Sequence, residues 1–210
     1  YEITGGFVAP LALCASVTYA ASLRPEVIVA CMREARMTVM LVVPAFLLVF
    51  MERIKAEGEK RAGRMFLLML RLSARLERWG IPAGRVLFPR IRRELSPDLK
   101  CFICGGAPTD PELVRAYAAL GLTVLQGYGL TETAPVIAVN TFRHNRIGSV
   151  GMPLPSAEVR IERNGGPRGE GELWVRGPMV FGEYHGEPEI TRAAFHRGWF
   201  RTGDIARRDR

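Results

Sequence analysis

The stretch Leu122-Thr-Val-Leu-Gln-Gly-Tyr-Gly-Leu-Thr-Glu-Thr133 decides the fold, because a short run of strand formers ends in a glycine-rich loop. Gly127 and Gly129 flank the ring of Tyr128, so the strand must end in a bend that permits unusual backbone dihedrals. Backbone flanked by glycine can approach a ligand closely. In α/β sheets, ligands bind at the carboxyl ends of parallel strands. The stretch therefore predicts a parallel strand that delivers a binding loop.

The side chains of this loop suit a nucleotide. Tyr128 offers a flat face to a purine ring, Thr131 offers a hydroxyl group, and Glu132 offers a carboxylate. A carboxylate oxygen is the kind of ligand that a hard cation takes, and the hydroxyl suits a phosphate. The alternative is an ordinary turn with an exposed Tyr and Glu. For an isolated Gly-Tyr-Gly both interpretations stay open, because a motif this short occurs often by chance.

A second loop is predicted beside the first. Residues 100–104 resemble a strand that ends at Gly105-Gly106. Asp110 can cap a helix over 111–120 that has a proline at its first position and a glycine just past its end. Two consecutive parallel strands would then place residues 105–108 next to 127–129, with room for a flat ring between them.

The amino-terminal part alternates between helical and strand patterns, which is typical of βαβ units. The expected elements are a helix over 5–15, a strand over 16–20, a helix over 25–34 and a strand over 39–43. Two apolar runs, 7–23 and 39–51, are interpreted as core. The second is too short to span a bilayer and contains Pro44, and no basic segment precedes the first, as a signal peptide would need.

After Asn140 the pattern changes to short alternating runs between glycines and prolines, among them Gly165 and Gly166. Runs 157–162 and 172–176 predict antiparallel strands, and 188–196 predicts a short helix. The predicted fold class is thus α/β: a parallel sheet with flanking helices, followed by a smaller antiparallel β-rich subdomain, a partial barrel. We expect the chain to divide into an α/β subdomain over residues 1–142 and a β-rich subdomain over residues 143–210.

Asp204 follows Thr202-Gly203 near the end of the sequence. A carboxylate after a glycine can accept both hydroxyl groups of a ribose, as the acidic residue of dinucleotide folds does. The alternative is a turn residue that bonds its own backbone.

Residues 51–100 carry most of the positive charge, with 13 Lys and Arg against 6 Asp and Glu. Within them, 64–79 predicts a basic amphipathic helix. Its apolar positions are Met65, Leu68, Met69, Leu72, Leu76 and Trp79, and its basic positions are Arg64, Arg71, Arg75 and Arg78. Such a helix either packs on the sheet with a solvated face or contacts anionic lipid. Nucleic acid is disfavoured because the charge is local and no nucleic-acid motif accompanies it.

The cysteines do not suggest a metal or disulfide framework. Cys101 and Cys104 flank a probable buried strand, and a second pair that would complete a zinc site is missing. We interpret them as structural thiols, in keeping with a cytoplasmic protein.

Three segments in this order resemble one family. The loop 126–133 is similar to the Tyr-Gly-x-Thr-Glu signature of adenylate-forming (AMP-binding) enzymes, and Cys104-Gly-Gly-Ala-Pro108 is similar to their Gly-Gly-Ala-Pro segment. Downstream, Gly171-Glu-Leu-Trp-Val-Arg-Gly177 and Gly198-Trp-Phe-Arg-Thr-Gly-Asp204 resemble their second half. With Tyr1-Glu-Ile-Thr-Gly-Gly6, the signature looks most like that of bacterial long-chain fatty acid–CoA ligases.

The resemblance implies ATP-dependent conversion of a fatty acid to an acyl-adenylate and transfer to coenzyme A, with Mg²⁺. It implies nucleotide contacts for Gly105, Gly106, Ala107, Pro108 and Tyr128, a phosphate contact for Thr131, a magnesium contact for Glu132 and a ribose contact for Asp204. Gln126, Gly127 and Gly129 would border the acyl pocket. It also places a phosphate loop before this region and a catalytic lysine after it, so we expect the 210 residues alone to be inactive.

Two alternatives to this function stay open. One is another carboxylate with a carrier-protein acceptor, and the other is a non-catalytic adenylate binder associated with a membrane. The expected location is the cytoplasm, with possible peripheral contact at the inner face of the membrane.

Overall fold

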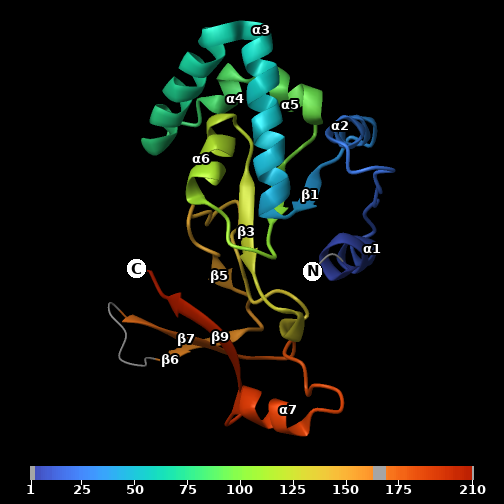
Figure 1. Ribbon diagram of the computed structural model, residues 1–210, viewed down its shortest axis with the longest axis vertical. Helices are drawn as coiled ribbons and strands as arrows, with labels where there is room; N and C mark the ends of the chain where they lie inside the picture. Colours follow the sequence, from blue (N-terminus) through green and yellow to red (C-terminus); the bar gives the residue numbers. More distant parts are fainter. Residues whose placement is uncertain (1–2, 163–168, 210) are drawn as a thin grey trace.

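The computed structural model describes residues 3–162 and 169–209 and contains two sheets, one above the other in Figure 1. The first sheet has the strand order β1-β2-β3-β4-β5. Its strands are β1 (Val39–Val42), β2 (Cys101–Cys104), β3 (Val124–Tyr128), β4 (Ala138–Val139) and β5 (Met152–Pro153). β1, β2 and β3 run parallel, and β4 and β5 add antiparallel pairs at one edge.

The second sheet is antiparallel, with the order β6-β7-β9-β8. Its strands are β6 (Glu158–Glu162), β7 (Glu170–Arg176), β8 (Phe195–His196) and β9 (Trp199–Arg207), with helix α7 (Pro188–Ala194) leading into β8. This pair of sheets confirms the predicted fold class. β5, which follows residue 142, still pairs with the first sheet, and the division at 142 stays a prediction. The glycines 165 and 166 lie outside the described residues.

Helices surround the parallel part of the first sheet (Figure 1). They are η1 (Thr4–Val8), α1 (Ala9–Ala12), α2 (Pro25–Glu34), α3 (Pro44–Arg78), α4 (Gly84–Leu87), α5 (Pro89–Leu95) and α6 (Pro111–Ala119). α6 begins as predicted, since the Asp110 side chain accepts a hydrogen bond from the backbone N–H of Glu112. The main core lies between α3, α6 and the sheet, where Phe50, Phe102 and Tyr117 are almost fully buried. The Tyr117 hydroxyl donates to the Leu47 carbonyl at 2.8 Å, so this buried polar group is satisfied.

Helix α3 is two helical arms joined at Gly63, where the backbone has φ 55° and ψ −141°. Only glycine adopts this region readily, and the chain folds back on itself there (Figure 1). The arms pack closely beside the break: a Cβ atom on Gly58 would lie 2.6 Å from the Phe66 ring. The residue types at 58 and 63 therefore permit the helical hairpin.

The second arm, residues 64–79, buries only part of the apolar stripe that the sequence singled out: Met69 and Leu76 are half-buried. Met65, Leu68, Leu72 and Trp79 are exposed, and the buried residues are Phe66 and Ser73. Of the two alternatives for this helix, packing of the apolar stripe is realised only in part, because the face that carries Phe66 and Ser73 fits against the rest of the molecule. No helix in the described part of the chain is long and apolar enough to cross a membrane.

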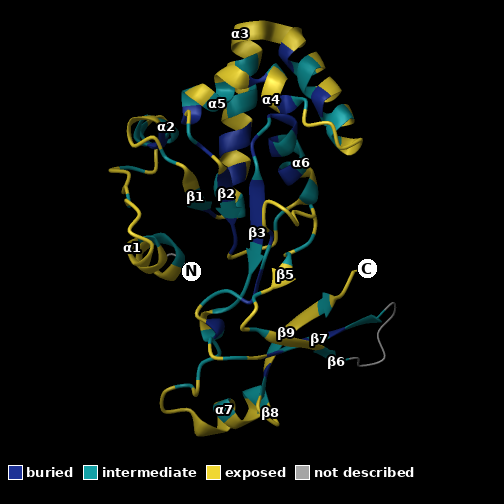
Figure 2. Ribbon diagram, turned by 180° about the vertical axis from the view of Figure 1, so that it is seen from behind, coloured by how far each residue is buried: buried dark blue, intermediate teal, exposed yellow. Residues whose placement is uncertain are grey.

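The predictions for 7–23 are also wrong in part. The chain is helical over Thr4–Ala12, as expected, but residues 16–20 form no strand. Leu11, Leu13, Tyr19 and Leu23 are exposed, as Figure 2 shows for the segment that leads to α2. Alternation of side chains is not enough for a strand, because a strand also needs a partner for its backbone groups, and none of the described strands pairs here.

Candidate active site

The two predicted loops lie side by side at the carboxyl end of the parallel strands. Cys104 at the end of β2 is in register with Gln126 in β3, so the segments that follow start at the same level. Gly105 is buried and donates from its N–H to the Val42 carbonyl at 3.3 Å. Residues 106–108 are exposed, and Gly106 has φ +83°. The parallel pairing of β2 and β3 therefore places an accessible loop beside Tyr128.

The two glycines around Tyr128 have different structural roles. A Cβ atom on Gly129 would lie 1.8 Å from the Pro135 carbonyl oxygen, so the chain folds back onto this residue. A Cβ atom on Gly127 would lie 3.6 Å from the Ala138 carbonyl oxygen, which is ordinary contact. Close backbone packing therefore requires glycine at 129 but not at 127.

The segment Thr131–Thr133 is one turn of 3₁₀ helix (η2) that presents its first two side chains and buries its third. The Thr133 hydroxyl accepts from the Leu130 N–H and donates to the Leu130 carbonyl, both at 2.9 Å. Thr131 is exposed and Glu132 is half-buried. Thr133 thus fixes the turn, and Thr131 and Glu132 stay accessible.

Glu132 is held by the chain that leads to α7. The Tyr184 hydroxyl donates to Glu132 Oε1 at 2.9 Å, and the Phe181 N–H donates to the Glu132 carbonyl at 2.9 Å. Burial and this carboxylate acceptor raise the pKa of Tyr184, so the phenol stays a neutral donor. Glu132 Oε2 accepts no hydrogen bond from a described residue. The carboxylate is therefore oriented through one oxygen and keeps the other for a ligand.

Tyr128 and Asp204 connect the two sheets. The Tyr128 hydroxyl donates to Asp204 Oδ2 at 2.5 Å, although 76 positions separate the two residues in the sequence. Burial raises the pKa of Tyr128, and the Asp204 acceptor raises it further. The structure thus brings together the aromatic residue and the acid that the sequence picked out in separate motifs.

Asp204 lies within β9, beside an irregularity in the pairing with β7, and is braced by neighbours that the sequence analysis missed. Glu172 accepts from the Gly203 N–H at 3.2 Å and from Trp174 Nε1 at 2.9 Å. The hydrogen bond from Trp174 lowers the pKa of Glu172, as does the charge of Arg201, so this carboxylate stays ionised. The Thr202 hydroxyl donates to the Leu173 carbonyl at 2.7 Å and accepts from the Asp204 N–H at 3.1 Å.

Of the missed residues, Glu172 and Thr202 stand inside motifs that the sequence analysis quoted, so their position was a usable signal. Tyr184 has no such signal. It reaches Glu132 only because the connection between β7 and α7 returns to the loop after β3.

Gln126 supplies an unpaired acceptor next to the loop. Its side chain is buried, and Oε1 has no hydrogen-bond partner among the described residues. A buried amide oxygen without a partner costs free energy, so its persistence at a strand end points to a ligand or water that donates to it.

The donor set fits a magnesium ion that arrives with a nucleotide. Among residues 3–162 and 169–209 there is no group of three or more His, Cys, Asp or Glu that could hold a metal alone. Mg²⁺ usually binds through one or two carboxylates together with water and substrate phosphates. Glu132 can supply one such carboxylate.

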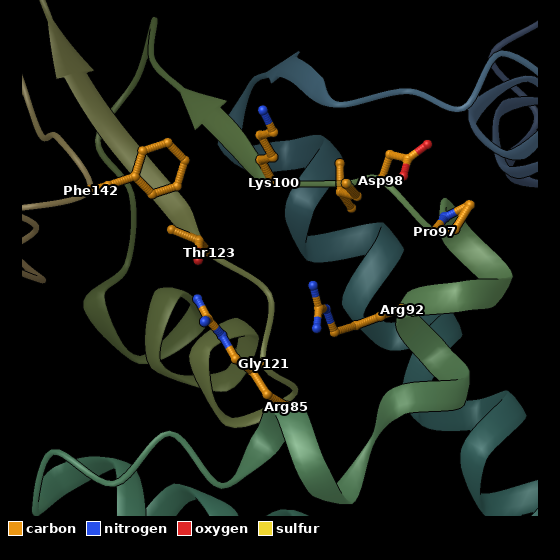
Figure 3. Close-up of a pocket in the computed structure, with 9 residues that line it drawn as sticks. Arg85, Arg92, Pro97, Asp98, Lys100, Gly121, Thr123 and Phe142 are labelled. Carbon is orange, nitrogen blue, oxygen red and sulfur yellow. The ribbon is translucent and has the colours of Figure 1, made fainter.

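A separate basic pocket of about 290 Å³ lies at the opposite, amino end of β2 and β3. Its lining includes Arg85, Arg92, Lys100 and Thr123 (Figure 3). Asp98, also in the lining, pairs with Arg36 at 2.7 Å. The pocket is remote from the loops at 105–108 and 126–133, and none of the predicted site residues lines it.

Cys101 and Cys104 are buried free thiols, and burial raises the pKa of both. Neutral thiols of this kind are poor nucleophiles, in agreement with their interpretation as structural residues.

The sequence of this chain is similar to those of several acyl-CoA ligases. The long-chain-fatty-acid–CoA ligase FadD15 of Mycobacterium bovis is 38% identical over 121 residues, which are 58% of this chain and 19% of that protein. A feruloyl-CoA synthase of Amycolatopsis sp is 41% identical over 124 residues, 56% of this chain and 25% of that protein. The chain thus spans a quarter or less of the length of these relatives.

Among solved structures, the inhibitor-bound N-terminal domain of FACL13 from Mycobacterium tuberculosis is similar to this chain with a TM-score of 0.62 and 28% identity. The match covers 90% of this chain and 40% of that one. The family described as AMP-binding enzyme matches residues 1–185. Because that match spans most of the 210 residues and agrees with the motifs, the chain belongs to the AMP-binding enzyme family.

Proposed function

We propose that these residues form part of an enzyme that activates a long-chain fatty acid with ATP and transfers it to coenzyme A. In the first step a carboxylate oxygen attacks the α-phosphorus of ATP, and pyrophosphate leaves. In the second step the thiol of coenzyme A attacks the acyl carbon, and AMP leaves. The observation that carries the proposal is the Tyr128–Asp204 hydrogen bond, which joins a flat aromatic ring to a carboxylate of the kind that accepts from ribose hydroxyl groups.

We assign the nucleotide contacts residue by residue. Tyr128 stacks on adenine, with 106–108 on the other side of the ring, and the buried Gly105 supports that loop. Asp204 accepts from the ribose hydroxyls, for which Oδ1 is free of bonds to described residues. The unpaired Oε1 of Gln126 supports this assignment, because the exocyclic amino group of a purine is a donor of the kind that it lacks.

We assign the contacts with the phosphates to the turn at 131–133. Thr131 donates to the α-phosphate, and Glu132 would hold magnesium through the oxygen that Tyr184 leaves free. When bound, the ion would neutralise charge that builds on the phosphates. The protein's own contribution is orientation: Tyr184 and the Phe181 N–H fix Glu132 before the nucleotide arrives.

The acid substrate is inferred from the residues of the loop. FadD15 is named for long-chain fatty acids and the Amycolatopsis protein for ferulate, so the similarity alone does not choose between them. We favour a fatty acid because the signature at 126–133 looks most like that of bacterial long-chain fatty acid–CoA ligases, and because Gln126 is the one polar side chain among the three residues that would border the acyl pocket. ATP and coenzyme A as co-substrates place the reaction in the cytoplasm.

The test uses the full-length protein with ATP, coenzyme A and a panel of acids. ATP–pyrophosphate exchange reports the first step, and thioester formation reports the second. Fatty acids of 12 to 18 carbons should support both steps, and ferulate and succinylbenzoate should not. Exchange with ferulate but not with fatty acids would show that the substrate is an aromatic acid. Exchange without thioester formation would indicate a carrier-protein acceptor. No exchange with any acid would indicate a non-catalytic adenylate binder.

The stacking role of Tyr128 is tested by two variants of the full-length protein. Tyr128→Phe keeps the ring and loses the bond to Asp204, and Tyr128→Ala loses both. Stacking of a base on an aromatic ring contributes about 1–3 kcal/mol. The dissociation constant for ATP should therefore rise at least fivefold in Tyr128→Ala and much less in Tyr128→Phe. Equal effects of the two variants on the dissociation constant would show that the Tyr128 ring does not stack on the nucleotide.

A further inference from the structure

The second arm of α3, residues 64–79, has a fixed orientation on the rest of the molecule. We call it the outer arm. Its buried face is held by the Ser73 hydroxyl, which donates to the Ala119 carbonyl of α6 at 2.7 Å. Phe66 packs edge to face on Phe88, with ring centroids 5.6 Å apart. Because these contacts fix the rotation of the helix, its other faces are presented to the surroundings in a defined way.

One of these faces is an apolar stripe. Met65, Leu68, Leu72 and Trp79 have relative exposures of 59%, 56%, 52% and 83%. At about 100° per residue, the four positions fall within about 60° of arc on the helix. Single exposed apolar side chains are normal, but a contiguous row of them on a rigid element marks an interaction surface.

The next face along the helix is a basic stripe. Arg64, Arg71, Arg75 and Arg78 are exposed and occupy another arc of about 60° beside the apolar one. None of the four forms an ion pair with a residue in the described part of the chain. Arg61, by contrast, pairs with Glu57 at 2.8 Å and with Glu94 at 2.6 Å.

We propose that the outer arm docks on the surface of an anionic lipid bilayer. The helix lies in the plane of the interface, with its leucines and Trp79 at the boundary between head groups and acyl chains. The arginines extend to the lipid phosphates. A rigid apolar row flanked by unpaired arginines is the arrangement that binds such surfaces. This inference does not depend on the proposed function.

Two other occupants fit the surface less well. A nucleic acid would use the arginines but leave the apolar row in water. A folded protein, including a second copy of this chain, needs about 800 Å² on each partner for a stable interface, of which four side chains supply only a part. The outer arm also lies at the far end of the molecule from the loop at 126–133, so a membrane there leaves the candidate site open (Figure 1).

The first test is sedimentation of the full-length protein with vesicles of phosphatidylglycerol and phosphatidylcholine, or of phosphatidylcholine alone. The variant Arg71→Glu/Arg75→Glu/Arg78→Glu is compared with Arg33→Glu/Arg143→Glu/Arg192→Glu, which makes the same change of charge at exposed positions elsewhere. Each arginine near an anionic surface contributes a factor of about five. We expect the outer-arm variant to lose binding at least tenfold and the control to keep it. Equal loss in both variants, or equal binding to neutral vesicles, would overturn the proposal.

The second test separates a lipid from other anionic partners. Leu68→Gln/Leu72→Gln alters only exposed side chains and should still fold, which circular dichroism verifies. Binding to anionic vesicles should fall about tenfold, because the apolar contact is lost. Unchanged binding would mean that charge alone is recognised, as a nucleic acid would recognise it.

The third test asks whether something already covers the stripe. The difference in fluorescence between the native protein and Trp79→Phe isolates the signal of Trp79. In free protein that signal should be quenched by acrylamide, and on vesicles it should be quenched by brominated acyl chains. Protection from acrylamide without vesicles would show that another segment or a second copy occupies the stripe, and the proposal would fail.

Discussion

The loop at 126–133 and the outer arm at 64–79 were both singled out by residue pattern, but they are held in opposite ways. The loop is shaped by its backbone: Gly129 lies against the Pro135 carbonyl, and the Thr133 hydroxyl bonds to both polar groups of Leu130. The outer arm is attached by side chains on one side, chiefly Phe66 and Ser73, and its apolar and basic stripes are exposed. We infer that a change where the loop backbone is tightly packed alters its folding, that a change of an accessible loop side chain alters its chemistry, and that changes on the exposed stripes of the outer arm alter neither.

The largest effect should come from Glu132→Gln in the full-length protein. The amide keeps the shape of the side chain, so the thermal midpoint should hardly change, but one anionic group is lost where charge builds on the phosphates. Losing one well-placed electrostatic group slows the chemical step about 100- to 1000-fold. ATP–pyrophosphate exchange measures the loss, and the exposed neighbour Glu183→Gln is the control. A near-normal rate of exchange at saturating magnesium would show that Glu132 does not take part in the reaction.

The glycines around Tyr128 give the next largest effect. Gly129→Ala forces a methyl group into backbone that cannot move away, and overpacking of this kind costs about 1–3 kcal/mol. Gly127→Ala meets only ordinary contacts, so its thermal midpoint should stay close to that of the native protein. Differential scanning calorimetry of the two variants side by side makes the comparison. If both are equally stable, the backbone does not shape the loop.

A smaller effect is expected at the break in α3. No atom lies within 4 Å of a Cβ built on Gly63, so Gly63→Ala tests backbone strain alone, at about 1–2 kcal/mol. Gly182 has equally open surroundings without a positive φ, so Gly182→Ala should be neutral or slightly stabilising. Thermal melts of both variants measure the difference. A Gly63→Ala protein as stable as Gly182→Ala would mean that the hairpin does not need glycine.

The smallest effect concerns Glu77, on the packed side of the outer arm. Its Oε2 is buried without a partner, and burial raises its pKa above the ordinary value, against the charge of Arg85. A raised folded-state pKa means that stability is fully present below the unfolded pKa and is lost as pH rises through the folded value. Glu77→Gln should therefore raise the thermal midpoint slightly at pH 7.5 and leave it unchanged at pH 4. The exposed Glu59→Gln should show no such difference, and a Glu77→Gln gain that persists at pH 4 would contradict this cause.

Much of the fold was predictable because local chemistry and global packing agree. Pro25 and Gly121 mark helix ends through their backbone preferences, and Asp110 does so through its capping side chain. The apolar runs at 39–42 and 101–104 predict strands of a parallel sheet. The loops at 105–108 and 126–129 followed from the pairing of those strands.

What could not be predicted depends on contacts between distant residues. Periodicity reveals that the outer arm has an apolar stripe, but not whether that stripe or the Phe66–Ser73 face is packed. The run at 16–20 alternates like a strand and finds no partner. Tyr184 becomes part of the candidate site only through the position of the second sheet, 52 residues from Glu132.

The connection between β1 and β2 is far longer than the sheet requires. A parallel crossover needs about a dozen residues, yet here residues 43–100 carry α3, α4 and α5 before the chain returns to the neighbouring strand. Val39 still pairs with Cys101 across this excursion, and the first arm of α3 covers the paired strands with Leu47 and Phe50. The first arm of α3 fills the core and has to stay, but the outer arm is a part of the crossover that an engineer could exchange while the strands that carry the candidate site keep their pairing.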